Sequence, residues 1–484
     1  MTLTGQTTKS STLWAPDRRA ATTGLLLLVT LAAFENMGVS TALPTLVADL
    51  NGHELYSWPF TAFLAAQVVG TVIGGRACDL RGPKSALLVG PLLFLVGLLV
   101  AGSAHDMGLL LAGRVLQGLG GGVQVVALYV LIALVFPEPD RPVAFAALSA
   151  AWVVPSLIGP TIAGLLTQYL SWRWVFLGLA PLVLLGWLLL FPVLRRLPAQ
   201  HSTSLALGAA PRAAPVPDGS LAGSLTKSAH ESAQAAVRRG LPLAALAAAV
   251  GLAALTWAGE HPSGLALGLG VLGLLVLAPS LRLLLPKGTL LARPGLPTVI
   301  LSRSLLAGTF FGVQAYLPLT LSQVHGLDPA LAGLPLTIGS LGWSGAAMWQ
   351  GRHRELSRTT LVRHGFVLLA AGLALVTLVA PSWGSPWLAL PAWVFAGIGM
   401  GLGISSVAVL VLELSEPGDR GFNSAALQLS DMIGQSVFIG LGGVLVAALG
   451  SATSPTAAVI PLDLGMAALA LLGALLVRRS ARNS

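Results

Sequence analysis

The sequence GRVLQGLGGG, at residues 113–122, opens a stretch (110–166) whose pattern recurs later in the chain. The stretch continues with a long apolar run, a polar break at Asp140-Arg141 and a second apolar run. A shift of 279 residues, the difference between 397 and 118, superposes the pattern without a gap. The matching positions that are not simply apolar are Gly118 with Gly397, Gly120 with Gly399, Gly122 with Gly401, Asp140-Arg141 with Asp419-Arg420, and Gly164 with Gly443. Two apolar runs and a connecting loop that repeat in this way indicate a chain built from duplicated halves.

The composition is that of a membrane protein. Of the 484 residues, 55% are hydrophobic and 9% are charged, and the mean hydropathy is +0.82. Soluble domains carry roughly a quarter charged residues, so we predict an all-α integral membrane protein. The single cysteine, Cys78, excludes a disulfide framework and a multi-cysteine metal site. We expect no cleaved signal peptide, because the apolar run after Arg18-Arg19 meets no cleavage-like site.

The apolar runs that are long enough to cross the ~30 Å hydrocarbon layer fall into groups of six, two and six, which predicts fourteen spans. They cover 21–48, 57–76, 84–103, 108–136, 143–169, 174–194, 240–258, 263–285, 297–323, 328–350, 360–380, 386–414, 421–449 and 457–477.

This grouping predicts how the chain is divided. The expected parts are an N-terminal tail (1–20), a six-helix bundle (21–196), a linker (197–239), an extra helix pair (240–286), a second six-helix bundle (296–478) and a short tail (479–484). The linker is rich in Ala, Ser and Pro, which is typical of a flexible connection.

Lys and Arg predict the orientation, because they are enriched in cytoplasmic loops. With the N-terminus inside, Arg173 is the one basic residue of the outer loops, and the others fall on the inner side. Both termini are then cytoplasmic, in a plasma or inner membrane. The net charge of +9 reflects this topology and does not indicate a nucleic-acid partner.

Glu35 lies well inside the first predicted span. A charge at that depth is costly, and intramembrane acids usually face a cavity and serve a function. Desolvation favours the neutral form of a carboxyl group, so Glu35 is expected to exchange a proton for a cation. A structural hydrogen bond between helices is the alternative.

Arg114 is the second buried charge, about two turns from the outer end of the fourth span. On a helix it shares a face with Gln117 and Gln124, with Gly118 and Gly122 on the adjoining face. That polar stripe is expected to face a cavity, with Arg114 supporting Glu35 through charge or hydrogen bonding. The alternative is snorkelling to the outer surface.

Asp431 is a candidate second protonation site in the other half, although it lies about three turns from the inner end of its span. A salt bridge of an inner gate is an equally open interpretation. Arg303, near an inner helix end, is a candidate gate or anchor residue.

The loop GRACDLRGPK, at 75–84, lies at the inner end of the second span. A glycine turn with an acid and bases at a helix terminus is suited to latching two helices on the cytoplasmic side, although an ordinary charged loop would look similar. The predicted latch residues are Gly75, Asp79, Gly82, Lys84, Arg141 and Arg420.

Several polar and aromatic residues are candidates for lining an amphipathic cavity, although most aromatics in such helices face lipid or neighbouring helices. They are Asn36, Trp58, Phe60, Phe63, Gln67, Gln117, Gln124, Tyr129, Trp152, Phe310, Phe311, Gln314 and Tyr316. The sequence has no acidic or His-rich cluster suited to a metal and no phosphate-binding glycine loop. We therefore expect neither an enzyme nor a bound metal or cofactor.

At these residues the chain resembles the major facilitator superfamily, and within it the drug:proton antiporters with fourteen spans. The 75–84 loop is similar to the family signature between spans two and three, with departures at Leu80 and Pro83 that could weaken the latch. Residues 114–118 match the span-four signature, whose arginine is implicated in proton coupling. Gly159, Pro160 and Gly164 fit the span-five antiporter signature, although Pro155 replaces a glycine, and Glu35 stands where span one usually has Asp.

The resemblance implies two six-helix bundles that rock about a central site, with the extra pair beside them. It covers nearly the whole chain, although the counterpart of the latch near Gln350-Gly351-Arg352-His353 is degenerate. It implies that a monomer uses the proton gradient to export an amphipathic drug. Export of an endogenous lipid, siderophore or self-made antibiotic is the main alternative, and a non-transporting receptor is a more distant one.

Overall fold

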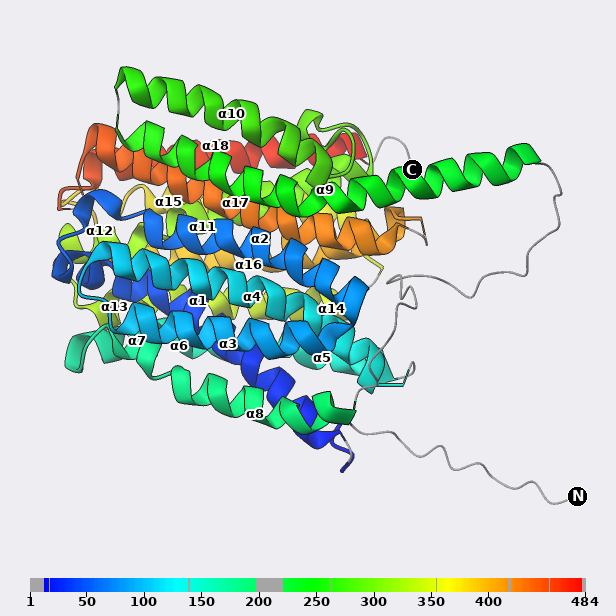
Figure 1. Cartoon of the computed structure of the whole chain (residues 1–484). Helices are drawn as coiled ribbons and strands as arrows, with labels where there is room; N and C mark the ends of the chain where they lie inside the picture. The colour runs from blue at the N-terminus through cyan, green and yellow to red at the C-terminus, as the bar shows by residue number, and fades with distance from the viewer. Residues whose placement is uncertain are drawn as a thin grey trace, which may run out of the picture.

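A computed structural model describes residues 13–16, 18–137, 140–196, 221–261, 263–353, 355–416, 419–451 and 453–480. Helices that run in alternating directions form one elongated body (Figure 1). This is the expected architecture in a bilayer, where a helix satisfies its backbone hydrogen bonds internally.

Eight helices form the N-terminal group. They are α1 (Arg19–Asp49), α2 (Trp58–Arg81), α3 (Pro83–Gly102), α4 (Met107–Val135), α5 (Arg141–Ala150), α6 (Val153–Tyr169), α7 (Trp174–Leu177) and α8 (Ala180–Arg196). Local chemistry explains their ends. The Asp106 carboxylate caps α4 by accepting a hydrogen bond from the Leu109 amide at 2.8 Å. Gly82 joins α2 to α3 at φ 73°, a conformation that side chains disfavour.

The remaining helices form the C-terminal group and an extra pair. The C-terminal group contains α11 (Leu296–Gln314), α12 (Leu317–Gln323), α13 (Pro329–Ala332), α14 (Leu334–Arg352), α15 (Arg358–Val376), α16 (Ala389–Leu414), α17 (Arg420–Leu449) and α18 (Thr456–Ser480). The extra pair is α9 (Leu221–Glu260) and α10 (Gly264–Leu284). Of the predicted linker, 197–220 lies outside the described residues and 221–239 is helical, in keeping with its many alanines.

Twelve helices of the described chain are long and apolar enough to cross a membrane by length and composition. The fourteen predicted spans are thus matched in twelve cases, and two differ. The span expected at 143–169 is divided between α5, of 10 residues, and α6, of 17 residues. The span expected at 328–350 corresponds to α13 and α14, and α14 carries Thr337, Ser340 and Gln350 among its apolar residues.

The repeated glycines place α4 and α16 in equivalent positions. Gly118 and Gly122 lie against the backbone of α2, and Gly120 lies against the backbone of α3. In the second half, Gly397 and Gly401 contact α14, while Gly399 contacts α15. Small residues let helices approach closely within a membrane, so the duplicated pattern encodes the same three-helix packing twice.

We expect Gly122→Ala to destabilise the protein measurably. A Cβ at Gly122 would lie 2.5 Å from the Thr71 backbone nitrogen, which forces α2 and α4 apart. Overpacking of this kind costs roughly 1–3 kcal/mol, so the Tm in detergent should fall. Gly121→Ala is the matched control, because its Cβ would meet only the Phe94 ring at 3.8 Å. Equal Tm values for the two variants would contradict this packing.

The extra pair covers the seam between α2 and α17. Its α9 packs against both of these helices, and α10 packs against α9 at the edge of the molecule (Figure 1). Ala245 and Ala248 of α9 share one apolar cluster with Val68 of α2 and Met432 of α17. The extra pair therefore contacts both halves along one side.

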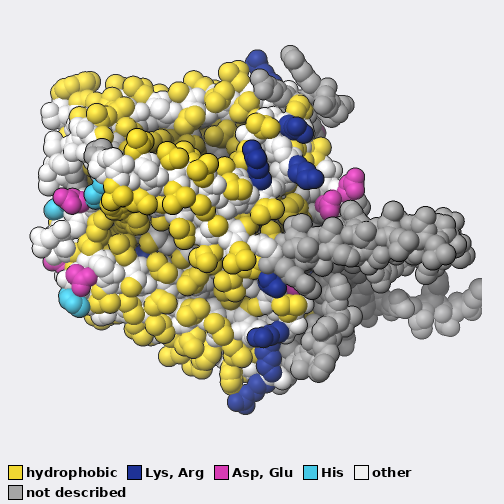
Figure 2. Space-filling view, turned by 45° about the horizontal axis from the view of Figure 1, so that its top comes forward, with side chains coloured by type: hydrophobic (Ala, Val, Ile, Leu, Met, Phe, Trp, Pro, Cys, Tyr) yellow, Lys and Arg dark blue, Asp and Glu magenta, His cyan; other side chains and the backbone are white. Residues whose placement is uncertain are grey.

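The two ends of the molecule differ in charge. Lys and Arg gather at one end, on the right of Figure 2, and hydrophobic side chains cover the middle. We call this the basic end; helices begin or end there at Arg19, Arg81, Lys84, Arg195, Arg282, Arg352, Arg358, Arg420 and Arg478. The opposite end carries the α1–α2 connection and the turn between α9 and α10.

Candidate functional site

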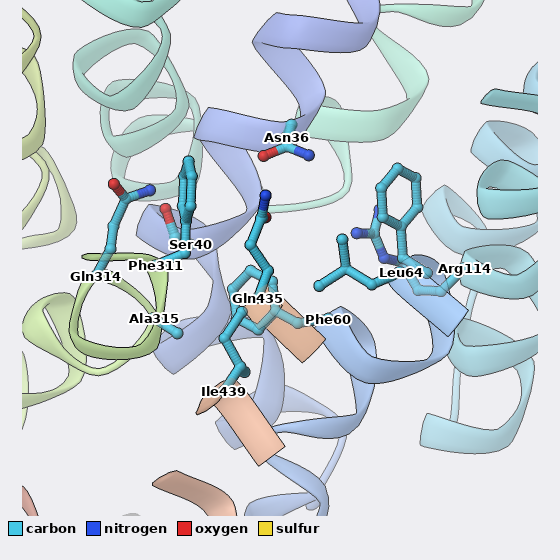
Figure 3. A pocket seen from close by; sticks show the side chains of 11 residues that line it. Asn36, Ser40, Phe60, Leu64, Arg114, Phe311, Gln314, Ala315, Gln435 and Ile439 are labelled. Atoms are coloured by element: carbon cyan, nitrogen blue, oxygen red, sulfur yellow. The ribbon is translucent and has the colours of Figure 1, made fainter. Parts of the chain in front are cut away.

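A small cavity lies between the two helical groups. Its walls come from α1, α2 and α4 on one side and from α11 and α17 on the other (Figure 3). The lining residues are Asn36, Ser40, Phe60, Phe63, Leu64, Arg114, Phe311, Gln314, Ala315, Gln435 and Ile439. Aromatic and aliphatic side chains combined with a few amides and one guanidinium make an amphipathic site.

Arg114 is the charged centre of this wall. Its side chain is almost fully buried, and its Nη1 donates to a Glu35 carboxylate oxygen and to Gln117 Oε1, the latter at 2.7 Å. Its Nε donates to the Pro59 carbonyl at 2.9 Å, and its guanidinium carbon lies 4.4 Å from the centre of the Phe63 ring. Arg114 is thus held inside the bundle and does not snorkel to the surface.

Glu35 lies directly behind Arg114. Its exposed fraction is 0%, and it is not among the residues that line the cavity. The second carboxylate oxygen, Oε2, has no hydrogen-bond partner among the described residues. The sequence suggested that Glu35 itself faces the cavity; instead, Arg114 separates it from the cavity, and the neighbouring Asn36 lines the wall.

Asp431 forms an ion pair with Arg303, with 2.7 Å between Oδ2 and Nη2. Both residues belong to the C-terminal group, on α17 and α11, so this salt bridge does not join the two halves as a gate would. Gln435, one turn further along α17, donates to Asp431 Oδ1 at 3.3 Å and also lines the cavity. Asp431 is therefore linked to the cavity through Gln435.

The structure brings some predicted cavity residues together and places others elsewhere. Asn36, Phe60, Phe63, Phe311 and Gln314 line the cavity as expected. Trp58, Gln67, Gln117, Gln124, Tyr129, Trp152, Phe310 and Tyr316 are not among its lining residues.

Four of the residues outside the lining set show where such side chains lie instead. Gln117 binds Arg114, and Gln124 is buried where α4 meets Gly90 of α3. Trp152 is 41% exposed at the break between α5 and α6. Tyr316 is fully buried and donates to the Ile439 carbonyl at 2.8 Å. Spacing along a helix does not reveal which neighbour occupies each face, which explains these differences.

Five lining residues were not singled out from the sequence, namely Ser40, Leu64, Ala315, Gln435 and Ile439. Gln435 had a usable signal, because a polar residue one turn after Asp431 shares its helical face. Two buried acids were also missed. Glu260 ends α9, and Asp463 is fully buried in α18, where neither carboxylate oxygen has a hydrogen-bond partner among the described residues.

The two helical groups meet closely at the end opposite the basic end. The Tyr56 hydroxyl donates to the Ala315 carbonyl at 3.1 Å, and the hydroxyls of Thr161 and Thr337 are 2.9 Å apart. Gly164, from the predicted antiporter signature, lies against the Ala330 backbone, and a Cβ there would lie 2.6 Å from the Ala330 Cα. These contacts join the two groups beside the cavity-lining residue Ala315, and we call this the closed end.

The remaining signature residues occupy the expected helices. Gly159 packs near Phe34 and Met37 of α1, and a Cβ at Gly333 would lie 2.9 Å from the Pro160 carbonyl oxygen. Gly75 and Asp79 lie on α2, with Gly82 and Lys84 at the start of α3. Arg141 donates to the Phe136 carbonyl at 3.2 Å, within its own half, and Arg420 is exposed at the start of α17.

Twelve long apolar helices in two groups with repeated packing define a multi-pass membrane protein, and an amphipathic cavity lies between the groups. The chain belongs to the Major Facilitator Superfamily, whose family model matches residues 25–439.

Relatives in this family include transporters from bacteria and fungi. An MFS-type transporter of Mycobacterium tuberculosis is 28% identical over 470 residues, which cover 93% of this chain and 63% of that protein. Multidrug resistance protein 3 of Bacillus subtilis is 33% identical over 172 residues, 36% of this chain and 33% of that protein. The acurin A biosynthesis cluster transporter of Aspergillus aculeatus is 40% identical over 145 residues, 30% of this chain and 26% of that protein. The matched regions thus span from about a quarter to less than two thirds of these relatives.

The fold also resembles solved structures. A POT family transporter crystallised with 5-aminolevulinic acid superposes with a TM-score of 0.64 over 95% of both chains. The sequence identity is 13%, so the likeness concerns the fold alone.

Proposed function

We propose that this protein is a proton-coupled secondary active transporter that exports lipophilic or cationic small molecules by alternating access. The observation that carries the proposal is the Glu35–Arg114 ion pair, in which one partner lines the cavity and the other is buried behind it. A buried intramembrane acid that is linked to a cavity wall through one basic residue is a candidate for proton exchange.

The proposed topology has fourteen spans, with α5–α6 and α13–α14 each crossing as an interrupted helix and with both termini in the cytoplasm. The charge distribution supports it, because Lys and Arg concentrate at the basic end and cytoplasmic loops carry that excess. The basic end is then the inner end, and the closed end is the outer one. The membrane is the plasma or inner membrane.

The coupling between proton and cargo depends on whether Glu35 neutralises the positive charge of Arg114. With Glu35 ionised, Arg114 is neutralised by the pair and the cavity accepts a cationic or amphipathic cargo. A proton on Glu35 removes the negative partner, so the positive charge of Arg114 is no longer compensated beside the cavity. Repulsion of a cationic cargo and rearrangement of the polar groups then favour release, and the gradient supplies ~2.3 kcal/mol per charge per 100 mV.

The cavity chemistry supports the cargo class. Phe60, Phe63 and Phe311 offer ring faces and edges to a planar lipophilic molecule. Asn36, Gln314 and Gln435 provide amides, and in Figure 3 the amides of Asn36 and Gln435 point towards one another across the cavity. A few polar groups in a mainly apolar pocket are typical of small-molecule sites.

Transport into vesicles tests the proposal. Inside-out vesicles or proteoliposomes that contain the protein should move a fluorescent lipophilic cation against its gradient when a pH gradient is imposed. Collapse of that gradient with a protonophore should abolish the movement. Movement that is unaffected by the protonophore would reject antiport.

Gln314→Ala should raise the KM for such a cation by roughly two- to tenfold with little change in kcat, because it removes one hydrogen-bonding group from the cavity wall. The control is Gln323→Ala, which removes an exposed glutamine from α12 at the outer end. Initial transport rates over a range of cation concentrations measure both constants. An unchanged KM for Gln314→Ala would place the cargo elsewhere.

A second candidate cargo is an endogenous product such as a lipid, a siderophore or a self-made antibiotic. The relative named for a biosynthesis cluster favours it. A panel of cargoes, compared by growth protection and by competition with the fluorescent cation, distinguishes the two candidates.

A further inference from the structure

Glu260, the last residue of α9, lies where the extra helix pair meets both halves of the transporter. Its Oε1 accepts a hydrogen bond from the Ser57 hydroxyl at 2.6 Å, and its Oε2 accepts one from the Trp58 indole nitrogen at 2.6 Å. Ser57 is fully buried and Glu260 is 8% exposed. Both carboxylate oxygens are therefore committed to the residues that begin α2.

The same carboxylate packs against the C-terminal half. Gly443 of α17 has no side chain, and a Cβ there would collide with the Glu260 carboxylate and with Ser57. One turn earlier, Thr256 of α9 fits against Gly440 in the same way. The end of α9 is therefore wedged between the first turn of α2 and the glycines of α17.

This wedge lies directly behind the outer closure of the cavity. Tyr56, next to Ser57, donates to the Ala315 carbonyl and packs against Tyr316, with 5.4 Å between the ring centres. Tyr316 donates to the Ile439 carbonyl, and both Ala315 and Ile439 line the cavity. A continuous set of contacts thus runs from the extra pair to the wall of the cavity.

Comparison of the duplicated halves shows that the extra pair supplies an additional contact at this position. Gly164 and Gly443 are equivalent in the repeat, and each lies against the opposite half at the outer end. Gly164 meets Pro329 and Ala330, whereas Gly443 meets Ser57 together with Glu260. The acid of α9 therefore strengthens one of two related contacts and makes the outer closure asymmetric.

We infer that Glu260 is a positioning residue of the outer gate, through which the extra helix pair holds the cavity closed to the outside. An outward-open state requires α2 to separate from α17, so Glu260 must lose its contacts with one of them. Hydrogen bonds to charged groups are among the stronger ones in proteins, so this step favours the closed state. The inference rests on the proposed alternating access and is independent of which residue carries the proton.

Accessibility of the cavity from outside tests the inference. Cys78→Ala removes the single cysteine, and Ser40→Cys then places an isosteric reporter in the cavity wall. Intact cells are treated with a membrane-impermeant maleimide, and the labelling rate is measured. In this background we expect Glu260→Ala to raise the rate by at least about tenfold, as loss of two charged hydrogen bonds implies.

Two further variants complete the design. The double variant Ser57→Ala/Trp58→Phe keeps the acid but removes both hydrogen-bond donors, so it should be labelled as fast as Glu260→Ala. If Glu260→Ala does not fold, the labelling rate of this double variant decides the test. Glu54→Ala removes an exposed acid from the same end and should label at the parent rate. Parent-like rates in both gate variants, or an equal rise in Glu54→Ala, would overturn the assignment. The readout is labelling and not transport, so a failure of proton coupling would leave it unaffected.

Discussion

Glu35→Gln will lose the ability to concentrate cargo against its gradient while it remains folded and embedded in the membrane. The amide cannot take up and release a proton, so under the proposed coupling the gradient no longer drives the cycle. A pH gradient equivalent to 100 mV provides ~2.3 kcal/mol per proton, which corresponds to a cargo ratio of about fiftyfold at equilibrium for a one-to-one exchange. In proteoliposomes with an imposed gradient, this ratio should fall to about one.

Glu35→Gln leaves Arg114 without its anionic partner, so a lowered Tm is expected, but the remaining hydrogen bonds of Arg114 should keep the protein folded. The amide oxygen of Gln can still accept from Arg114 Nη1, and Arg114 keeps its bonds to the Pro59 carbonyl and Gln117. Binding of the fluorescent cation, measured without a gradient, should persist. Asp431→Asn is the comparison, since that acid is paired within the other half. Full gradient-driven accumulation by Glu35→Gln would remove this residue from the coupling mechanism.

Arg114→Met is expected to have the largest effect on stability. It leaves a fully buried Glu35 without its cationic partner, and breaking one side of a buried ion pair typically costs about 3–5 kcal/mol. We expect a strongly lowered Tm and a low yield of monodisperse protein in detergent.

The double variant Glu35→Gln/Arg114→Met separates the buried charge from the packing. Removal of both charges should restore much of the Tm without restoring transport, since no uncompensated charge then remains buried. Arg173→Met is the control, because its pair with Asp49 is partly exposed and such pairs contribute little. A Tm for Arg114→Met as high as that of Arg173→Met would show that the buried pair is not formed.

Most of the helices can be predicted from the sequence, because a membrane span requires only a local run of apolar residues. An apolar run of sufficient length must become a helix in lipid, and helices such as α3 and α4 begin and end within a residue of the predicted 84–103 and 108–136. Breaks within a run were harder to foresee. The span predicted at 143–169 divides at Ala151-Trp152, where Pro155 has no backbone N–H to donate to the Ala151 carbonyl.

The buried acids were also only partly predictable from the sequence. Glu35 and Asp431 could be recognised because carboxylates are rare at such depths. Arg114 was also expected to support Glu35, although 79 residues separate them, whereas the pairing of Asp431 with Arg303, 128 residues away, was not predicted. Glu260 falls just beyond a predicted span, so it resembled an ordinary loop residue, although it is buried between α2 and α17.

The sequence by itself determined that this is a membrane protein, that its halves repeat, where most of the helices lie and which charged residues lie at membrane depth. Each of these depends on local composition or spacing. Only the tertiary structure decided that Arg114 stands between Glu35 and the cavity, that Asp431 pairs within its own half, and that Glu260 joins the extra pair to both α2 and α17. These outcomes depend on which helix faces meet across the bundle. Periodicity defines a face but not its neighbour, and the close approach of backbones at small residues selects that neighbour.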